Sequence, residues 1–466
     1  MAGFSTPLPA YGRPRHYGTI AAKGTGQAGA LERAGATIVF AALLLATVAL
    51  NAFKVGGVPI RGLFVLGALA LSVLLYFDVA KRVLKDNLLL LSLAAGLAVL
   101  GIFVSLVNQA PAAAVLWNVT EVHVQAAATI MVAAILARVA GPRASALAIV
   151  AVIAVSALVA AAQMMDMHAA WALRRALGPL THEELQGLNL QERRPVGLAY
   201  SPIQFSTHLC LAFAAFVAVR DKLRWSASGA DPLVVPALLA LFAASIACAT
   251  RSPILGGFVF IAAYALQRRT SWLPLFLIVA AVAVYFAWPM LMEVVGTNAP
   301  RVVRTDDNSA EARSTLVYYG LRLFADNPLG YGLTFAPMTL WQHYWPDLYM
   351  MQAPEGAREN ELHNYLVNMI NTYGVGLLLF TPVVARLLMR SKASLIFFIP
   401  YIIHILFHNY GPFFNDNVIW FVIAAIAAAN VEQDVRREAA LRGIAAPALN
   451  SRRMSPAPRR YTGSAG

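Results

Sequence analysis

The chain is built from long apolar segments that alternate with shorter polar ones. About twelve segments are apolar over roughly the 17–25 residues that a helix needs to cross a bilayer. Each is predicted to be helical, because hydrocarbon leaves no water for unpaired backbone groups. The predicted spans are 35–53, 60–79, 88–107, 119–138, 144–163, 202–220, 233–250, 253–267, 272–290, 365–388, 394–410 and 413–430. The eighth span is the weakest, because it is short and only Arg268 and Arg269 separate its apolar residues from the ninth.

The composition agrees with a membrane protein. Of 466 residues, 59% are hydrophobic and 13% charged, whereas a soluble domain is nearer half apolar and a quarter charged. This excludes a soluble enzyme and a disordered chain, and it predicts an all-α polytopic membrane protein. The net charge of +13 is attributed to cytoplasmic loops and anionic lipid, not to nucleic acid. Cys210 and Cys248 lie in apolar segments, which argues against a disulfide framework.

The basic residues predict the orientation. With the N-terminus in the cytoplasm, most of the 36 Lys and Arg residues fall in inner loops and tails, so both termini are predicted to be cytoplasmic. Residues 1–33 and 431–466 are predicted to be disordered basic tails that flank a transmembrane domain at 34–430. We expect no cleavable signal peptide, because residues 1–33 are polar and basic. Two long outer loops are predicted, at about 164–201 and at about 291–364, the latter between helices 9 and 10.

The second outer loop contains its own structural signals. Asn308 is predicted to cap a helix with Leu316, Gly320, Leu323 and Phe324 on one face. Asp326 to Gly330 should end this helix. An aromatic-rich stretch follows, with Tyr331, Phe335, Trp341, Tyr344, Trp345 and Tyr349. These rings suit sugar rings or lipid headgroups, and an aromatic belt at the membrane interface is an equal alternative.

His363 lies at the end of this loop, where the next span begins. Glu359 is four residues earlier and would lie over the same face if the helix has already started. A carboxylate there would orient the imidazole, and histidine is the commonest general base. The alternative is that His363 is an ordinary hydrogen-bonded polar residue at the start of a helix, without a catalytic role.

Five outer arginines are candidates for anion binding: Arg193, Arg194, Arg251, Arg313 and Arg322. A charge at a membrane turn is costly without a partner, and the planar guanidinium suits a phosphate. The alternative is an ion pair with Glu311, Asp306 or Asp307, or extension of the side chain toward lipid headgroups. Function is favoured for Arg251, whose short outer turn otherwise avoids charge. An ion pair is favoured for Arg322.

Other polar residues carry weaker signals. His404 and His408 are four apart, but no acidic residue or Cys is near them in the sequence and the HExxH pattern is absent, so no metal site is predicted. Glu121 and His123, near the outer start of the fourth span, are expected to line the cavity, and pairing with each other's neighbours is the alternative. No Walker-type glycine-rich loop indicates nucleotide hydrolysis.

Four stretches together resemble the O-antigen ligase and polymerase superfamily of bacterial envelope proteins. They are Arg194-Pro195-Val196-Gly197-Leu198, Thr250-Arg251-Ser252, Arg313 followed by Asn327-Pro328-Leu329-Gly330-Tyr331-Gly332, and His363-Asn364-Tyr365-Leu366 followed by Tyr373-Gly374-Val375-Gly376-Leu377. His408-Asn409 and Asn415-Asp416-Asn417 resemble the family's last outer turn. The resemblance covers roughly residues 190–430. Thr250 departs from it, because the family commonly has Ser before this arginine.

The resemblance implies a helical bundle in the bacterial inner membrane, with a large periplasmic loop over a cavity that faces the periplasm. The donor would be a glycan on undecaprenyl pyrophosphate, and the acceptor a sugar hydroxyl of lipid A-core or of another lipid-linked glycan. No metal, cofactor or nucleotide is implied. His363 would be the general base, and Arg251 and Arg313 would also be catalytic. Donor pyrophosphate would bind Arg194, Arg251 and Arg313, with support from Glu359, Arg193, Tyr331 and His408.

Other functions remain open at this point. A transporter or flippase for polysaccharide or lipid-linked sugar would also have about twelve spans, and a scaffold for envelope assembly is a third possibility. The ionisable residues gather on one side and the long loops are asymmetric, which favours a glycosyltransferase. The sequence does not distinguish a ligase from a polymerase.

Overall fold

The computed structural model describes residues 29–56, 58–178, 194–224, 231–248, 250–268, 308–414 and 416–441. The chain divides into two compact units. One comprises Ala28–Ala429, and the other comprises Met1–Gln27 with Asn430–Gly466. In the second unit the described residues form the last turns of a helix, where Arg436 pairs with Glu432 one turn earlier. The remaining structure belongs to the first unit.

The first half of the chain is helical apart from one short hairpin. The helices are α2 (Ala30–Ala49), α3 (Ile60–Leu75), α4 (Phe77–Val107), α5 (Ala112–Asn118), α6 (Gln125–Ala140), α7 (Pro142–Met164) and α8 (His168–Ala176). A π-helical turn at Val119–Val124 joins α5 to α6. Strands β1 (Lys54–Val55) and β2 (Val58–Pro59) pair antiparallel immediately before α3.

The second half continues in the same way. Its helices are α10 (Pro202–Leu223), α11 (Val234–Ala247), α12 (Ser252–Arg268), α15 (Asn308–Asp326), α16 (Trp341–Leu348), α17 (Gly356–Glu359), α18 (Tyr365–Tyr373), α19 (Thr381–Leu395), α20 (Ile399–Leu406) and α21 (Val418–Leu441). Short 3₁₀ turns lie at Pro337–Thr339, Gly374–Phe380 and Ile396–Phe398.

These helices confirm an all-α polytopic membrane protein. In the described ranges seven helices are long and apolar enough to cross a membrane, and four shorter helices are also apolar. Each predicted span coincides with a helix or a run of helices, except 272–290, which lies outside the described residues. The total of twelve spans and their orientation therefore stay predictions.

Two predicted boundaries are wrong. Helix α21 continues to Leu441, so residues 431–441 are helical and do not belong to a disordered tail. The reason is that a helix can leave the apolar layer and continue in water, with ion pairs one turn apart replacing lipid contacts. At the other end of the chain, α2 begins at Ala30, so residues 30–33 are helical and do not belong to the predicted N-terminal tail.

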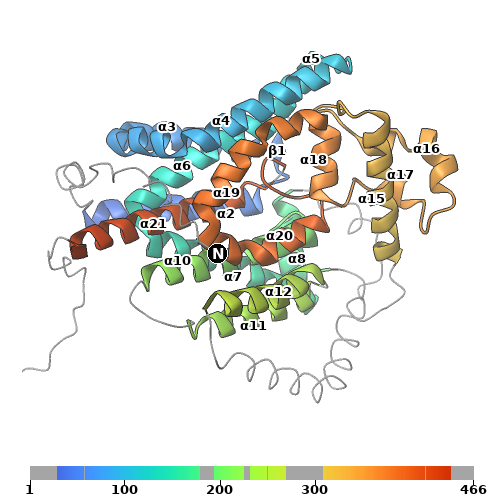
Figure 1. Ribbon diagram of the computed structural model, residues 1–466. Helices are drawn as coiled ribbons and strands as arrows, with labels where there is room; N and C mark the ends of the chain where they lie inside the picture. Colours follow the sequence, from blue (N-terminus) through green and yellow to red (C-terminus); the bar gives the residue numbers. More distant parts are fainter. Residues whose placement is uncertain are drawn as a thin grey trace, which may run out of the picture. The chain divides into compact units, whose positions relative to one another are not determined.

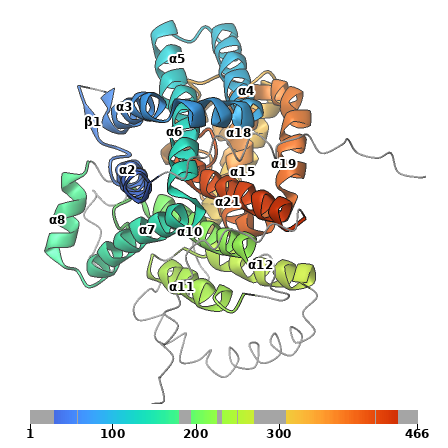
Figure 2. The same ribbon diagram turned by 90° about the vertical axis from the view of Figure 1, so that its left-hand side faces the viewer.

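The main core lies among α2, α6, α7, α10 and the N-terminal part of α21, which are drawn from blue to red in Figures 1 and 2. Many of its buried residues are alanines, such as Ala133 and Ala137 of α6, both fully buried. Small side chains let membrane helices approach closely, which increases their van der Waals contact. Phe40 of α2 packs edge-on against Phe421 of α21, with ring centroids 5.1 Å apart.

Helices α15, α16 and α17 form a separate outer segment, drawn beside α18 in Figure 1. The predicted helix from Asn308 to Asp326 is confirmed, and its predicted face is buried at Leu316, Gly320 and Leu323. The buried residues that form the core of this segment are Leu316, Tyr319, Leu323, Tyr344, Leu348, Ala357, Leu362 and Val367. Tyr344 therefore serves packing, a role that neither interpretation of the aromatic stretch predicted.

The outer segment is held on the bundle by backbone hydrogen bonds. The amides of Tyr331 and Gly332 donate to the carbonyl groups of Asn371 and Thr372, at 2.7 and 2.9 Å. Gly330 and Gly374 meet in this contact, both with positive φ, at +86° and +63°. A Cβ on Gly330 would lie 2.5 Å from the Gly374 nitrogen, a distance that real contacts do not reach. Only glycine fits here, and the two glycines let the backbones pair.

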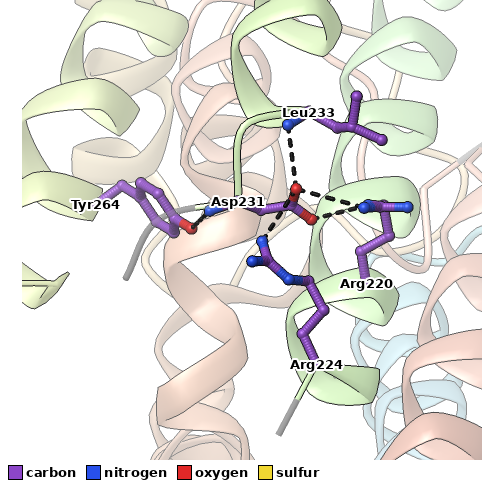
Figure 3. Close-up of polar contacts among 5 residues, drawn as sticks. All are labelled: Arg220, Arg224, Asp231, Leu233 and Tyr264. Atoms are coloured by element: carbon purple, nitrogen blue, oxygen red, sulfur yellow. Dashed lines mark hydrogen bonds and ion pairs between the residues drawn. The ribbon is translucent and has the colours of Figure 1, made fainter. Parts of the chain in front are cut away.

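An ion-pair cluster joins α10, α11 and α12 where α10 ends and α11 begins (Figure 3). Asp231 is buried and pairs with Arg220 at 2.8 Å and Arg224 at 3.0 Å. The Leu233 amide donates to its carboxylate at 3.0 Å, and its own amide donates to the Tyr264 hydroxyl at 3.2 Å. Burial alone would raise the pKa of Asp231, but the hydrogen bonds from Arg220 and Leu233 and the charges of Arg220 and Arg224 outweigh it and lower this pKa.

Replacing Asp231 should destabilise this end of the three helices. Asp231→Asn removes the charge that balances two arginines, so we expect a lower apparent unfolding temperature and a loss of about 1–3 kcal/mol. A carboxyl group with a depressed folded pKa stabilises the fold above its unfolded pKa of about 3.9 and loses that contribution as the pH falls through the folded value. The wild type should therefore lose more stability than the variant between about pH 5 and pH 2.

Thermal unfolding of the purified protein in detergent measures both effects. Asp86→Asn is the matched control, because Asp86 pairs with Arg138 at 3.0 Å but is about half exposed. An exposed pair contributes about 0–1 kcal/mol. Equal shifts for the two variants would show that the Asp231 cluster does not support the helix ends.

Candidate functional site

His363 is held in place by its two neighbours in the sequence. Leu362 is fully buried in the core of the outer segment. Asn364 caps α18: its side-chain oxygen accepts from the Val367 amide at 3.1 Å. The amide nitrogen of Asn364 donates to the Leu406 carbonyl at the end of α20, at 2.9 Å. The His363 backbone is thus fixed to the outer segment on one side and to α20 on the other.

A backbone carbonyl sets the tautomer of His363. Its Nδ1 lies 2.8 Å from the Glu361 carbonyl oxygen, and because a carbonyl oxygen only accepts, Nδ1 carries the proton. In the neutral ring Nε2 then holds the lone pair. The expected helical relation to Glu359 is wrong, because α17 ends at Glu359 and the backbone is extended at Asn360. Helices α17 and α18 are separate, so four residues of spacing do not place Glu359 and His363 on one helical face.

Two further histidines lie beside it and are bridged by a serine. The His404 and His408 ring centroids are 4.4 Å apart, and those of His363 and His408 are 6.4 Å apart. The Ser252 hydroxyl lies 2.8 Å from His404 Nδ1 and 3.3 Å from His408 Nε2. His404 Nε2 lies 3.1 Å from the Ile203 carbonyl oxygen and must donate to it. In the neutral rings the chain of hydrogen bonds then runs from His408 Nε2 to Ser252 and from Ser252 to His404.

This assignment leaves His408 Nδ1 as a buried acceptor. Among the described residues it has no hydrogen-bond partner. His408 is only 2% exposed, and burial without a negative partner disfavours a charged imidazole. The electrostatic neighbours of His408 are His404, Arg313, His363 and Arg194. His408 is therefore a neutral group among positive ones. The same electrostatic neighbours show that the structure brings Arg194, Arg313 and His363 together around it.

Arg194 and Arg251 are placed by the end of α11 and the start of α12. Arg194 donates from Nε to the Cys248 carbonyl at 3.3 Å. Thr250 is buried and its hydroxyl lies 2.7 Å from that of Ser206. Arg251 is exposed at the start of α12, where its carbonyl accepts from the amides of Ile254 and Leu255. It directly precedes Ser252, so it joins the same site, and its charge lies at a helix N-terminus, which attracts anions.

The remaining predicted residues have different positions. Arg313 lies half-buried on α15, whereas Arg322 pairs with Asp347 at 3.1 Å and Asp326 at 3.9 Å. The predicted ion pair of Arg322 is thus present, with other partners than expected. Tyr331 donates from its hydroxyl to the Leu323 carbonyl and packs within the outer segment. Arg193 lies outside the described residues, and only the backbone of Glu359 is described.

Several residues that build this site were not predicted to have a role in it. Ser252 was noted only as part of a motif, and Asn364 only as a neighbour of His363. His404 was noted only for its spacing of four residues from His408, and the partner that the two histidines share is the Ser252 hydroxyl group. Within the described ranges no group of three or more His, Cys, Asp or Glu side chains is placed to hold a metal ion.

Comparison with known proteins identifies the segment that carries much of this geometry. Residues 232–381 match the family model described as O-antigen ligase. Over these residues the chain is similar to the O-antigen ligase family. No curated protein matches the chain. The resemblance to the O-antigen ligase and polymerase superfamily is thereby confirmed over the matched residues.

The matched segment includes Arg251, Arg313 and His363, together with the glycines that join the outer segment to α18. Arg194 and His408 lie outside the matched residues, and the fold brings both to the same place. The glycine-containing motif at 327–332 has a structural role in this segment. It forms the backbone contact that positions α15 and the His363 segment.

The Asn364 cap can be tested separately from its second hydrogen bond. Asn364→Ala should lose both, cost about 1 kcal/mol of stability, and speed hydrogen exchange at the Val367 amide. Asn364→Asp keeps the capping oxygen but not the amide donor, so the Val367 amide should stay protected while the contact with Leu406 is lost. Hydrogen–deuterium exchange of the detergent-solubilised protein measures this. Equal exchange in the two variants would contradict the capping role.

Proposed function

We propose that the protein transfers a glycan from undecaprenyl pyrophosphate to a sugar hydroxyl. One observation carries the proposal: the Glu361 carbonyl fixes the proton of His363 on Nδ1, and Arg194 and Arg313 lie around the neighbouring His408. A base with its lone pair on Nε2 and a set of cations beside it are the two requirements of this reaction. The similarity to the O-antigen ligase family supports a lipid-linked glycan as the substrate class.

The arginines act on the leaving group. As the bond between the anomeric carbon and the phosphate oxygen breaks, negative charge grows on the pyrophosphate. Arg194, Arg251 and Arg313 provide positive charge that is already oriented, so stabilising this charge needs little rearrangement. Each guanidinium can also donate two parallel hydrogen bonds to phosphate oxygens. The neutral His408 lies among these cations without adding to their repulsion.

His363 acts on the acceptor. Its Nε2 takes the proton of the acceptor hydroxyl while that oxygen attacks the anomeric carbon of the donor glycan. The new glycosidic bond forms as the bond to phosphate breaks, and undecaprenyl pyrophosphate leaves with the bonding electron pair. The Glu361 carbonyl stabilises the imidazolium that results, because it accepts the Nδ1 proton throughout.

We further propose the orientation that the basic residues predict, with both termini in the cytoplasm and the site on the periplasmic side of the inner membrane. The outer segment at 308–364 then faces the compartment that contains the acceptor. A ligase would use lipid A-core as the acceptor and a polymerase another lipid-linked glycan. Both reactions use the same base and the same leaving group.

Loss of His363 should abolish transfer but not donor binding. His363→Ala removes the base, which typically costs about 10²–10⁴ in rate, and leaves the arginines in place. The measurement is transfer from a purified lipid-linked donor by the protein in detergent, with donor binding assayed in parallel. His343→Ala is the matched control, because His343 is an exposed histidine of the same outer segment. A His363→Ala protein that transfers at the wild-type rate would rule out the base.

Arg251→Lys should reduce transfer strongly although it keeps the charge. Lysine is a point charge and cannot make the paired hydrogen bonds of a guanidinium, so we expect a loss of about 10–100-fold. Arg322→Lys is the control, because its exposed ion pair with Asp347 contributes little. If both variants insert normally and transfer equally well, Arg251 does not bind the pyrophosphate.

A further inference from the structure

A further arginine, Arg61, is buried and has no role in the proposed donor site. It lies in the first turn of α3 and only 4% of it is exposed. In the described residues its Nε has no hydrogen-bond partner. The neighbouring Gly62 explains the burial: a Cβ there would lie 2.5 Å from the Gln125 amide nitrogen, so glycine lets α3 approach α6 closely. A buried guanidinium without partners costs several kcal/mol.

The two carboxylates near Arg61 are engaged elsewhere. Its electrostatic neighbours are Glu121, Asp416 and Tyr410. One oxygen of Glu121 pairs with Lys54 at 3.6 Å, and the other accepts from the Trp117 indole at 3.1 Å. One oxygen of Asp416 accepts from the Tyr401 hydroxyl at 2.8 Å, and the other accepts from the Val418 amide at 3.1 Å. These carboxylates balance the charge of Arg61 but do not accept its hydrogen bonds.

The charge around Arg61 selects the kind of ligand. Arg61 and Lys54 carry two positive charges, and Glu121 and Asp416 two negative ones. A further anion would meet no net positive charge, unlike at the proposed donor site, where arginines outnumber acids. Neutral oxygen atoms suit the unpaired Nε donor of Arg61 better, since they accept hydrogen bonds without adding charge. Sugar hydroxyl and ring oxygens have this chemistry.

Tyr410 is the electrostatic neighbour that links Arg61 to the histidine-bearing stretch of chain. Tyr410 is two residues after His408, its hydroxyl bonds to Ser201, and its electrostatic neighbours include Arg61 and Glu361. Arg194 and Arg313 act on His408, and neither is an electrostatic neighbour of Arg61. Asn409 donates to the Glu361 carboxylate between the two groups. Tyr410 and Asp416, which interact with Arg61, thus belong to the same stretch of chain as His408, which interacts with Arg194 and Arg313.

We propose that Arg61 binds oxygen atoms of the acceptor saccharide. This inference rests on the proposed function. In a single displacement the attacking hydroxyl and the leaving pyrophosphate are on opposite sides of the anomeric carbon. Arg194 and Arg313 act on His408, whereas Arg61 acts on Tyr410 and Asp416, farther along the same stretch of chain. An acceptor sugar that gives its hydroxyl proton to His363 therefore extends toward Tyr410 and Arg61.

Transfer kinetics with each substrate varied separately test this. Arg61→Gln should raise the KM for the acceptor glycolipid by about 10–100-fold, with the donor KM unchanged and the rate at saturating acceptor near that of the wild type. The acceptor is extracted from cells that lack the protein. Arg138→Gln is the control, because Arg138 lies in the last turn of α6, at the other end of this helix from Gln125. Arg61→Lys keeps the buried charge if Arg61→Gln does not fold, and its acceptor KM should rise by a smaller factor.

A binding experiment separates this proposal from the proposed function. The probe is the oligosaccharide released from the acceptor glycolipid by mild acid and treated with phosphatase, so it contains neither lipid nor phosphate. It should bind the wild type and bind the Arg61 variants at least about 10-fold more weakly. An unchanged acceptor KM, a raised donor KM, or equal binding of this probe would overturn the role of Arg61. Absence of transfer by the wild type would instead refute the proposed function, while probe binding would still decide the role of Arg61.

Discussion

The geometry of the site depends on the backbone contact between residues 330–332 and 371–374. Hydrogen bonds from Tyr331 and Gly332 fix the outer segment to the end of α18, and α18 begins one residue after Asn364. Arg313 is on one side of this contact and His363 on the other. Leu362 and Val367 also pack into the core of the outer segment, so the contact and this core together hold Arg313 and the proposed base, His363, in one arrangement. The arrangement of the proposed site therefore depends on the positive φ of two glycines as well as on its ionisable groups.

The site combines two electrostatic environments within a short stretch of chain. Around His408, cations surround a neutral imidazole whose proton is held by Ser252, a side chain that carries no charge. Around Arg61 the positive and negative charges balance, and the Nε donor of Arg61 still lacks a hydrogen-bond acceptor among the described residues. The first environment suits a diphosphate and the second a polyol. Tyr410 lies between them, so one outer turn after α20 takes part in both.

Hydropathy was sufficient to predict most of the helices, because burial in lipid leaves a continuous apolar signal. The limits of α15 also followed from local signals, a capping Asn308 and the Asn327-Pro328 stop. The end of α21 could not be predicted in this way, because the helix continues where the apolar signal stops. The group of Ser252, His404 and His408 depends on how α12 packs along α20, which no sequence spacing encodes. The burial of Arg61 could not be predicted either, since it results from the absence of a side chain at Gly62.

The contact that holds the outer segment has a consequence for how such proteins diversify. Its hydrogen bonds join main-chain atoms, and its one strict side-chain requirement is hydrogen at Gly330 and Gly374. The exposed surface of the segment, including Tyr349 and Met350 at 66% and 83% exposure, does not take part. Exchange of those exposed side chains would change what the segment recognises without changing where it attaches. Attachment and recognition are thus encoded in separate sets of positions, and natural variation can alter the second while it leaves the first intact.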